Sequence, residues 1–364
     1  MKDCLIVGGG LIGMLTAKEL SDAGMRVTLL ESGQIGRESS WAGGGIISPL
    51  YPWRYPNAVT ALANWSQNAY PELSEELCQM GSIDPEYSVN GLLILDPGDS
   101  VEALQWSKKC HQTIQQIDID RISIIEPSLQ CHAQEALWMP DVAQIRNPRL
   151  VKALHQAITP KITIHQQTRV TGLLTKNHRI KGVQTEQGQI ESDRVVICAG
   201  AWSGELLQSL IAPPAIEPVL GQMIIFRHQP GKISRITLHQ KRYVIPRRDG
   251  RVLVGSTLEY RGFNKTTTEQ AKQELQDFAL NHYPELANCE IEHHWAGLRP
   301  GSPNGIPFIS PVPEIAGLYI NAGHFRNGVV LGPASCRLIA DIILERPLIL
   351  TKTDYSLTAN RNIQ

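Results

Sequence analysis

The sequence lacks a strong excess of either charge, and it lacks long apolar runs. Its 364 residues include 34 Lys and Arg against 35 Asp and Glu, which gives a formal net charge of -1. Nucleic acids and anionic membranes attract proteins through a basic field, so this balance argues against both as partners. No uninterrupted apolar stretch approaches the roughly 20 residues needed to cross a bilayer. We therefore expect no membrane span.

Paired cysteines and an export signal are missing as well. The seven cysteines are scattered, odd in number and without a CxxC pair or a metal-ligand spacing, which predicts reduced and mostly buried thiols. His293 and His294 are adjacent, and neighbours on a strand point to opposite faces, so no metal site is expected. Residues 4–7 already form an apolar run, without the charged and long apolar parts of a signal peptide. These absences predict a cytoplasmic protein.

A glycine motif near the N-terminus predicts a dinucleotide site. Gly8, Gly10 and Gly13 follow the apolar run with GxGxxG spacing, and residues 14–23 form an amphipathic helical pattern. The glycines permit a tight turn, a close approach to a pyrophosphate and close helix packing, and the helix N-terminus stabilises the phosphate charge. Glu31 ends a second strand, where it can accept hydrogen bonds from ribose hydroxyls. The strand, the helix and Glu31 together disfavour the alternative of a purely structural turn.

Further small-residue segments favour FAD over NAD as the dinucleotide. A bulky isoalloxazine needs backbone contacts from several distant loops. Residues 39–40 and 43–45 are Ser-Ser and Gly-Gly-Gly, and they continue a glycine-rich approach after the first motif. Ala199-Gly200, which follows a buried strand, and the segment 323–328 can supply the other contacts.

The order of the predicted elements favours two interleaved domains. A chain of this length exceeds the usual size of one hydrophobic core, and 42% of its residues are apolar. Nucleotide-binding patterns occupy the start, the middle and the end, and two segments of antiparallel character interrupt them. We predict an α/β fold of mixed α+β character, with a Rossmann-like FAD-binding domain and a substrate domain on an antiparallel or mixed sheet. The first takes residues 1–75, 144–215 and 294–364, and the second takes residues 76–143 and 216–293.

At these residues the chain resembles the FAD-dependent D-amino acid oxidase and sarcosine oxidase superfamily, and most closely the bacterial glycine oxidases of thiamine biosynthesis. The likeness runs almost end to end. It rests on residues 8–13 with 31–32, 195–200 with 202–204, 243–247, 295–300 and 323–328. Sarcosine oxidases that bind flavin covalently use a cysteine between the last two motifs, and residues 298–325 contain none. The resemblance thus implies non-covalent FAD, and it also suggests a homotetramer.

The resemblance also implies roles for individual residues. Arg299 would grip the substrate carboxylate, Tyr243 would hydrogen-bond it, and Arg326 would lie close to substrate and flavin. The other expected substrate-pocket residues are Ile46, Lys241 and Leu258, of which the last two replace a histidine and a methionine of the glycine oxidases. The residues expected at FAD are Gly8, Gly10, Leu11, Ile12, Gly13, Glu31, Ser32, Ser39, Ser40, Gly44, Gly45, Ile46, Val170, Ala199, Gly200, Trp202, His324, Phe325, Arg326, Asn327, Gly328, Val329 and Val330.

The chemistry that these residues suit is oxidation of a small amino acid or amine. A bidentate arginine fits a planar carboxylate better than lysine does, and Arg299 sits between Gly297 and Pro300 on a constrained turn. We expect the neutral amine to deliver hydride directly to the flavin, so that no catalytic acid or base residue is needed. The imine would be hydrolysed by water, and O2 would be reduced to hydrogen peroxide. His324 is expected to be structural or to contact the flavin loop.

Two other functions and one segment stay open. A D-amino acid or secondary-amine dehydrogenase of the same superfamily would pass its electrons to an acceptor other than O2. A flavin-binding assembly subunit without chemistry is the non-catalytic alternative, which the paired arginines disfavour. The proline- and aromatic-rich residues 49–56 fit either a lid over the flavin or an interdomain or subunit contact.

Overall fold

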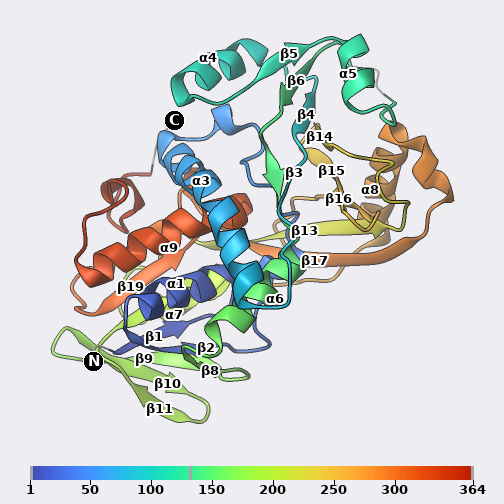
Figure 1. Cartoon of the computed structure of the whole chain (residues 1–364). Coiled ribbons are helices and arrows are strands. Elements are labelled where there is room, and N and C mark those ends of the chain that lie inside the picture. Colours follow the sequence, from blue (N-terminus) through green and yellow to red (C-terminus); the bar gives the residue numbers. More distant parts are fainter. Residues whose placement is uncertain (1–2, 131–132, 362–364) are drawn as a thin grey trace.

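A six-stranded sheet forms the lower part of the molecule in Figure 1. The structure is a computed structural model that describes residues 3–130 and 133–361. The strands are β1 (Asp3–Val7), β2 (Arg26–Leu30), β8 (Thr163–His165), β12 (Val195–Ile197), β18 (Phe308–Pro311) and β19 (Leu318–Ala322). They lie in the order β18-β19-β12-β1-β2-β8, and all pairs are parallel except β18 with β19. The predicted Rossmann-like, mixed α/β fold is confirmed.

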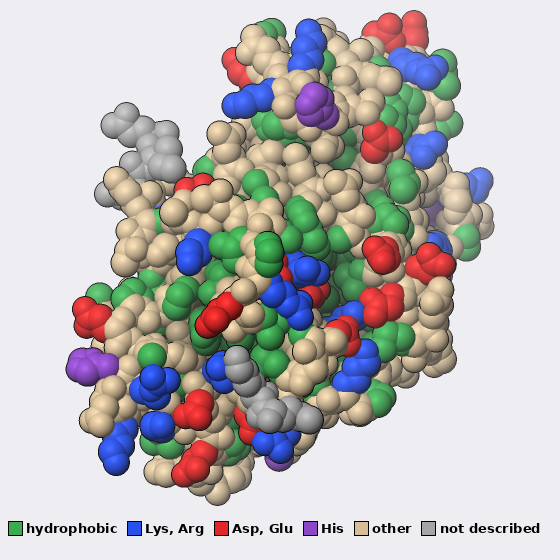
Figure 2. Space-filling model, turned by 60° about the vertical axis from the view of Figure 1, so that its left-hand side comes forward, with side chains coloured by type: hydrophobic (Ala, Val, Ile, Leu, Met, Phe, Trp, Pro, Cys, Tyr) green, Lys and Arg blue, Asp and Glu red, His purple; other side chains and the backbone are tan. Residues whose placement is uncertain are grey.

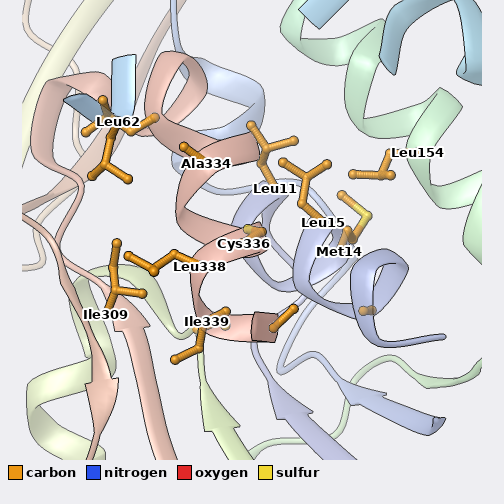
Figure 3. Packing of buried hydrophobic residues seen from close by; sticks show 14 of the residues in the cluster. Leu11, Met14, Leu15, Leu62, Leu154, Ile309, Ala334, Cys336, Leu338 and Ile339 are labelled. Atoms are coloured by element: carbon orange, nitrogen blue, oxygen red, sulfur yellow. The ribbon is translucent and has the colours of Figure 1, made fainter. Parts of the chain in front are cut away.

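Four helices pack around a core beside this sheet: α1 (Leu11–Asp22), α3 (Asn57–Met80), α6 (Asn147–Ile158) and α9 (Gly328–Leu344). Figure 3 shows Leu11 and Leu15 of α1 pointing toward Ala334 of α9, with Leu154 of α6 beside them. Each buried leucine of this kind stabilises the fold by about 1.5–3 kcal/mol relative to an exposed one. The core therefore fixes α1, and with it the glycine turn at the start of α1, against the C-terminal helix.

The C-terminal segment Phe325–Leu344 is long and apolar enough to cross a membrane, with a mean hydropathy of 1.4. The sequence analysis expected no membrane span, because no uninterrupted apolar run is long enough. In the structure 72% of its apolar window is buried inside the protein, which is the environment of a core helix.

An eight-stranded sheet forms the second layer, in the order β17-β13-β16-β15-β14-β4-β6-β5. Its strands are β4 (Leu92–Leu95), β5 (Gln115–Ile117), β6 (Ala136–Met139), β13 (Glu217–Phe226), β14 (Ile236–His239), β15 (Arg242–Pro246), β16 (Val252–Gly255) and β17 (Ile291–Gly301). Helix α8 (Glu269–His282) packs its Leu275 and Ala279 into the core of this sheet. Figure 1 shows the long strands β13 and β17 running between the two parts of the molecule.

The predicted domain boundaries stay a prediction. The strands of each sheet come mainly from the segments assigned to the corresponding domain, yet three elements cross a boundary: α3 spans the one at 75/76, β7 the one at 143/144, and β17 the one at 293/294. Strand β17 pairs with β13 of the eight-stranded sheet along its whole length, so the predicted boundary at 293/294 falls inside a continuous strand and not in a flexible linker.

The remaining elements are short. A three-stranded sheet contains β9 (Val170–Lys176), β10 (Arg179–Thr185) and β11 (Gly188–Glu191), and β3 (Ser88–Val89) pairs with β7 (Ala143–Gln144). The short helices are α2 (Ser39–Ala42), α4 (Ser100–Cys110), α5 (Ile119–Ile125) and α7 (Ser203–Leu207). On the face drawn in Figure 2, Lys and Arg alternate with Asp and Glu, as the balanced composition suggests.

The cysteines are less buried than the sequence predicts. Of the six that the structure describes, all free, Cys4, Cys198 and Cys336 are buried, whereas Cys78 is exposed. Cys131 lies outside the described residues.

Candidate active site

A cavity of about 630 Å³ lies between the two layers. Its wall includes residues at the carboxyl ends of β1, β2 and β12, where parallel α/β sheets bind ligands. The opposite wall comes from β13, β15 and β17 of the eight-stranded sheet. One cavity therefore touches both the predicted dinucleotide turn and the predicted substrate residues.

Most of the predicted site residues line this cavity. They are Gly8, Gly10, Leu11, Ile12, Glu31, Ser32, Ser39, Ser40, Gly44, Gly45, Ile46, Val170, Ala199, Gly200, Trp202, Tyr243, Arg299, His324, Phe325, Arg326, Asn327, Gly328, Val329 and Val330. Gly13 lies behind the wall, against the carbonyl oxygen of Gly8.

The structure does not bring Lys241 and Leu258 to the cavity wall. Lys241 is the second of two residues between β14 and β15, with φ of 48° at Gln240 and 69° at Lys241. Positive φ at both positions is typical of a tight hairpin turn, and the Lys241 side chain is exposed there. Leu258 is 44% exposed on the loop after β16.

The glycine turn after β1 is shaped for close backbone approach. Gly8 has φ +111°, and a Cβ on it would collide with the carbonyl oxygen of Cys198. A Cβ on Gly13 would collide with the carbonyl oxygen of Gly8, so α1 can pack this closely on the turn only with glycine. The amide of Leu11 donates to Ser40 Oγ at 2.8 Å. The turn thus presents backbone at the N-terminus of α1, as a pyrophosphate site requires.

Glu31 is held in a fixed orientation at the end of β2. Its Oε2 accepts from the amide of Gly9 at 2.8 Å, and its Oε1 accepts from the amide of Gly33 at 2.7 Å. A carboxylate oxygen can accept more than one hydrogen bond, so both oxygens keep capacity for ribose hydroxyls.

Two further groups in the wall fit a flavin dinucleotide. Asn327 Nδ2 is buried without a hydrogen-bond partner among the described residues, and an orphaned donor of this kind calls for a ligand acceptor. Cys198 also lines the cavity, and burial raises the pKa of its thiol well above the usual value. A thiol held neutral in this way is a poor nucleophile, because the thiolate is the reactive form.

Arg299 of β17 is fixed on the backbone of β13. Its Nη2 donates to Ser256 Oγ at 2.6 Å, and its Nη1 donates to the carbonyls of Leu220 and Thr257 at 3.1 and 3.2 Å. A Cβ on Gly221 would collide with the guanidinium. These contacts hold one edge of the guanidinium and leave other N–H groups for a ligand.

Arg299 and Arg326 bring two positive charges to the part of the cavity wall beside Tyr243. Neither arginine forms an ion pair within residues 3–130 and 133–361. Burial is the main cause that lowers the pKa of Arg299, while Tyr243 counteracts the shift and Arg326 adds to it. Arginine nevertheless stays protonated at neutral pH. The charges of the pair suit an anionic ligand next to Tyr243, which is 7% exposed.

Sequence reasoning missed Gly221, Met223 and Ser256, which also line the cavity. The strand register brings them there: Met223 pairs with Gly255, Gly221 with Gly297, and Gly255 also with Tyr243. These pairings join distant parts of the chain, and no local motif marks them.

Two segments border the cavity. The predicted lid, residues 49–56, contributes Leu50 to the wall, and Arg54 fastens it by stacking 4.0 Å over Tyr51 and pairing with Asp99 at 2.6 Å. On the loop after β16, Phe263 stacks on the wall residue Trp202 at 5.3 Å. Whether residues 49–56 act as a lid stays a prediction.

His324 is buried in a hydrogen-bonded row. Its Nε2 lies 2.7 Å from Ser335 Oγ, which donates to Asn321 Oδ1 at 2.6 Å. The Ser335 hydroxyl donates its only proton to Asn321, so it must accept from His324 Nε2, which carries the imidazole proton. Burial lowers the pKa of His324 to about 3. A neutral imidazole bonded to Ser335 in this way suits the structural role expected for His324.

Replacing His324 by glutamine is expected to weaken the loss of stability in acid. The unfolded imidazole takes up a proton near pH 6.5, whereas the folded one does so only near pH 3. Between these values the unfolded state binds more protons, so the free energy of unfolding decreases as the pH is lowered, by up to about 1.4 kcal/mol per pH unit. Urea unfolding of His324→Gln between about pH 7 and about pH 5 should show a shallower decline than the wild type. An unchanged decline would contradict a neutral buried imidazole.

Several known proteins are similar to this chain over nearly its whole length. The family described as FAD dependent oxidoreductase (DAO) matches residues 3–342. Glycine oxidase of Pseudomonas aeruginosa is 49% identical over 354 residues, or 97% of each chain. The bifunctional protein ThiO/ThiG of Synechocystis is 33% identical, and the match covers 95% of this chain and 53% of that protein.

Solved structures agree with this likeness. Glycine oxidase of Bacillus cereus has a TM-score of 0.90 at 28% identity, and the match covers 100% of both chains. Glycine oxidase of Geobacillus kaustophilus has a TM-score of 0.92 at 25% identity, with 99% of this chain and 100% of that one covered.

Proposed function

Since the chain belongs to the FAD dependent oxidoreductase family, we propose that it oxidises glycine and other small amino acids or amines, with O2 as electron acceptor. One observation carries the substrate class. Arg299 and Arg326 line the cavity without ion pairs to any described residue, next to Tyr243 and to the dinucleotide turn. Two such arginines suit a ligand that brings its own carboxylate.

FAD fits the residues of the opposite wall. The glycine turn would hold the pyrophosphate, Glu31 the adenosine ribose, and Asn327 Nδ2 a flavin acceptor. We propose that FAD is bound non-covalently, because the wall cysteine, Cys198, is a buried neutral thiol. When bound, FAD would supply the hydride acceptor and, on reoxidation by O2, the electrons for hydrogen peroxide.

The chain's own residues position the substrate. Arg299 binds the carboxylate, because Ser256 and two backbone carbonyls prevent its guanidinium from turning away. Arg326 adds positive charge, and Tyr243 contributes a hydroxyl that lies 3.9 Å from Met223 Sδ. A carboxylate fixed from one side leaves the Cα–H bond with few orientations, which is how positioning lowers the barrier.

No residue of the described cavity wall is assigned as a catalytic acid or base. His324 is held neutral by burial and is occupied by Ser335. The amine therefore enters unprotonated, and the Cα–H bond breaks as a hydride leaves. Water then hydrolyses the imine, so that glycine, O2 and water give glyoxylate, ammonia and hydrogen peroxide.

The wider setting follows from the relatives. We propose that the reaction serves thiamine biosynthesis, which the resemblance implies, and a fused ThiO/ThiG relative supports this. A cytoplasmic location and assembly into a homo-oligomer, as a homotetramer, complete the proposal.

Purified protein is expected to be yellow and to convert glycine and O2 to hydrogen peroxide and ammonia in equal amounts. An amine panel followed by peroxide release would identify the preferred substrate. Bleaching of the flavin by glycine under nitrogen without recovery in air would point to a dehydrogenase instead. Colourless protein that FAD does not reconstitute would refute the proposal.

A further inference from the structure

Arg247 is a buried arginine to which the proposed reaction gives no role. It follows β15, closes the motif 243–247 and is only 7% exposed. None of the ion pairs in the described chain involves it. Burial lowers the pKa of Arg247 to about 10, so it is charged at neutral pH. A buried cation without a carboxylate partner must be compensated by hydrogen bonds.

The hydrogen bonds of Arg247 lead to the cavity wall. Its Nη2 donates to the carbonyl of Gly44 at 2.7 Å. Its Nη1 donates to Gln144 Oε1 at 2.6 Å and to the carbonyl of Ile145 at 3.3 Å. One planar guanidinium therefore connects the end of β15, the segment before α6 and the glycine loop 43–45.

Further hydrogen bonds join the glycine loop 43–45, residues 144–145 and β15. Gln144 Nε2 donates to the carbonyl of Pro246 at 2.8 Å, and the amide of Ile145 donates to the carbonyl of Gly45 at 2.8 Å. On the other side of the loop, Trp295 Nε1 donates to the carbonyl of Ala42 at 3.1 Å. The glycine loop is thus tied to both β15 and β17, the strands that carry Tyr243 and Arg299.

The position of Gly44 determines the space in front of Tyr243. A Cβ on Gly44 would lie 3.2 Å from Tyr243 Cε2 and 2.9 Å from Ile245 Cδ1. Contacts this short leave no spare room between the loop and β15. Since Gly44 and Tyr243 both line the cavity, a small shift of the loop changes the width available to a ligand.

We propose that Arg247 is a positioning residue that sets the separation between the glycine loop 43–45 and Tyr243, and thereby the fit of a small carboxylate at Arg299. The identity of the ligand in this inference rests on the proposed function. The role of Arg247 in placing the glycine loop 43–45 rests only on the hydrogen bonds described above.

Arg361 offers a matched control. It is a half-buried arginine that, like Arg247, donates to backbone carbonyls, those of Ile306, Pro307 and Ser356, and burial lowers its pKa to about 10 as well. Arg361 does not line the cavity. A merely structural role would make Arg247 and Arg361 variants behave alike.

The test compares Arg247→Lys with Arg361→Lys in the FAD-loaded protein. Lysine keeps the charge but cannot donate to Gly44, Gln144 and Ile145 together. In Arg247→Lys we expect the Kd of glycolate, read from the flavin absorption spectrum, and the KM of glycine to rise by about tenfold, as for one lost hydrogen bond to a charged group. Amide exchange in residues 42–47 should quicken, while kcat should change less than KM. Arg361→Lys should lower the Tm and leave glycolate Kd and loop exchange unchanged.

Equal behaviour of the two variants, with loop exchange and glycolate Kd unaltered, would overturn the proposal. If Arg247→Lys does not fold, Gln144→Met removes one acceptor of Arg247 and should give a smaller change in the same direction. If the wild type does not oxidise glycine, the proposed function fails, yet loop exchange in the variants still decides the role of Arg247.

Discussion

Replacing Arg299 by methionine is expected to lower kcat/KM for glycine by about 100- to 1,000-fold, which corresponds to roughly 3 to 4 kcal/mol of lost binding to the carboxylate. The loss should be large because Arg299 is fixed by three hydrogen bonds before any ligand arrives. Lysine at this position keeps the charge but not the bidentate geometry. The kcat/KM of Arg299→Lys should therefore lie between those of the wild type and of Arg299→Met. Initial rates of peroxide release measure the effect.

The stability of the Arg299 variant separates function from folding. Arg299 has no carboxylate partner in the described chain, so its removal leaves no unpaired carboxylate, and the Tm should move by only about 2–4 °C. Arg326→Met should lose less activity, since no hydrogen bond between described residues fixes its guanidinium. Arg227→Met, at an exposed arginine paired with Glu292, is the control and should keep full activity. Wild-type kcat/KM in flavin-loaded Arg299→Met would show that the carboxylate binds elsewhere.

Substituting alanine for Gly13 is expected to abolish FAD binding. The added Cβ would collide with the backbone carbonyl of Gly8. Because this oxygen belongs to the backbone, no side-chain rotation can relieve the collision. Helix α1 must then move away from the turn, at a cost of about 1–3 kcal/mol of stability, and the amides at its N-terminus lose their place at the pyrophosphate. The ratio of flavin to protein absorbance after purification should fall to near zero, and added FAD should not restore it.

Gly204→Ala is the matched control for that substitution. Gly204 is also a buried helical glycine, but its Cβ would lie 3.4 Å from the nearest atom, the carbonyl oxygen of Pro214. This variant should purify yellow. Tight FAD binding by Gly13→Ala would contradict a pyrophosphate site at this turn.

Local patterns predicted the parts of the fold in which sequence neighbours interact. The strand, turn and helix at the first glycine motif were predicted because their signals lie within about 30 residues. Proline is a less reliable local signal. Pro71 lies inside α3 and Pro333 lies inside α9, although proline usually marks the end of a helix or its first turn. In both, the packing of the surrounding apolar face outweighs the hydrogen bond that proline removes. In α6 the local signals agree with the structure, because Pro148 lies near the start of the helix and its apolar residues are regularly spaced.

The site was predictable where a motif marks it and not where strand register creates it. Gly221 and Ser256 hold Arg299 only because β13, β16 and β17 pair side by side, and their sequence separation hides this. Lys241 and Leu258 were assigned to the pocket from the family resemblance. The hairpin turn at Lys241 and the exposed loop at Leu258 keep both away from the wall in this chain.

The order of strands in the six-stranded sheet also bears on how the protein is made. Strand β1 comes first from the ribosome, and β12 beside it must wait for β19, whose residues are Leu318–Ala322. At about 5–20 residues per second, roughly 15–60 s pass between synthesis of β1 and of β19. Until then the edge of β12 stays unpaired, and Asn327 is absent from the cofactor wall. The nascent chain therefore cannot complete its cofactor site before β19 and Asn327 have been synthesised, and we expect FAD to bind only after that point.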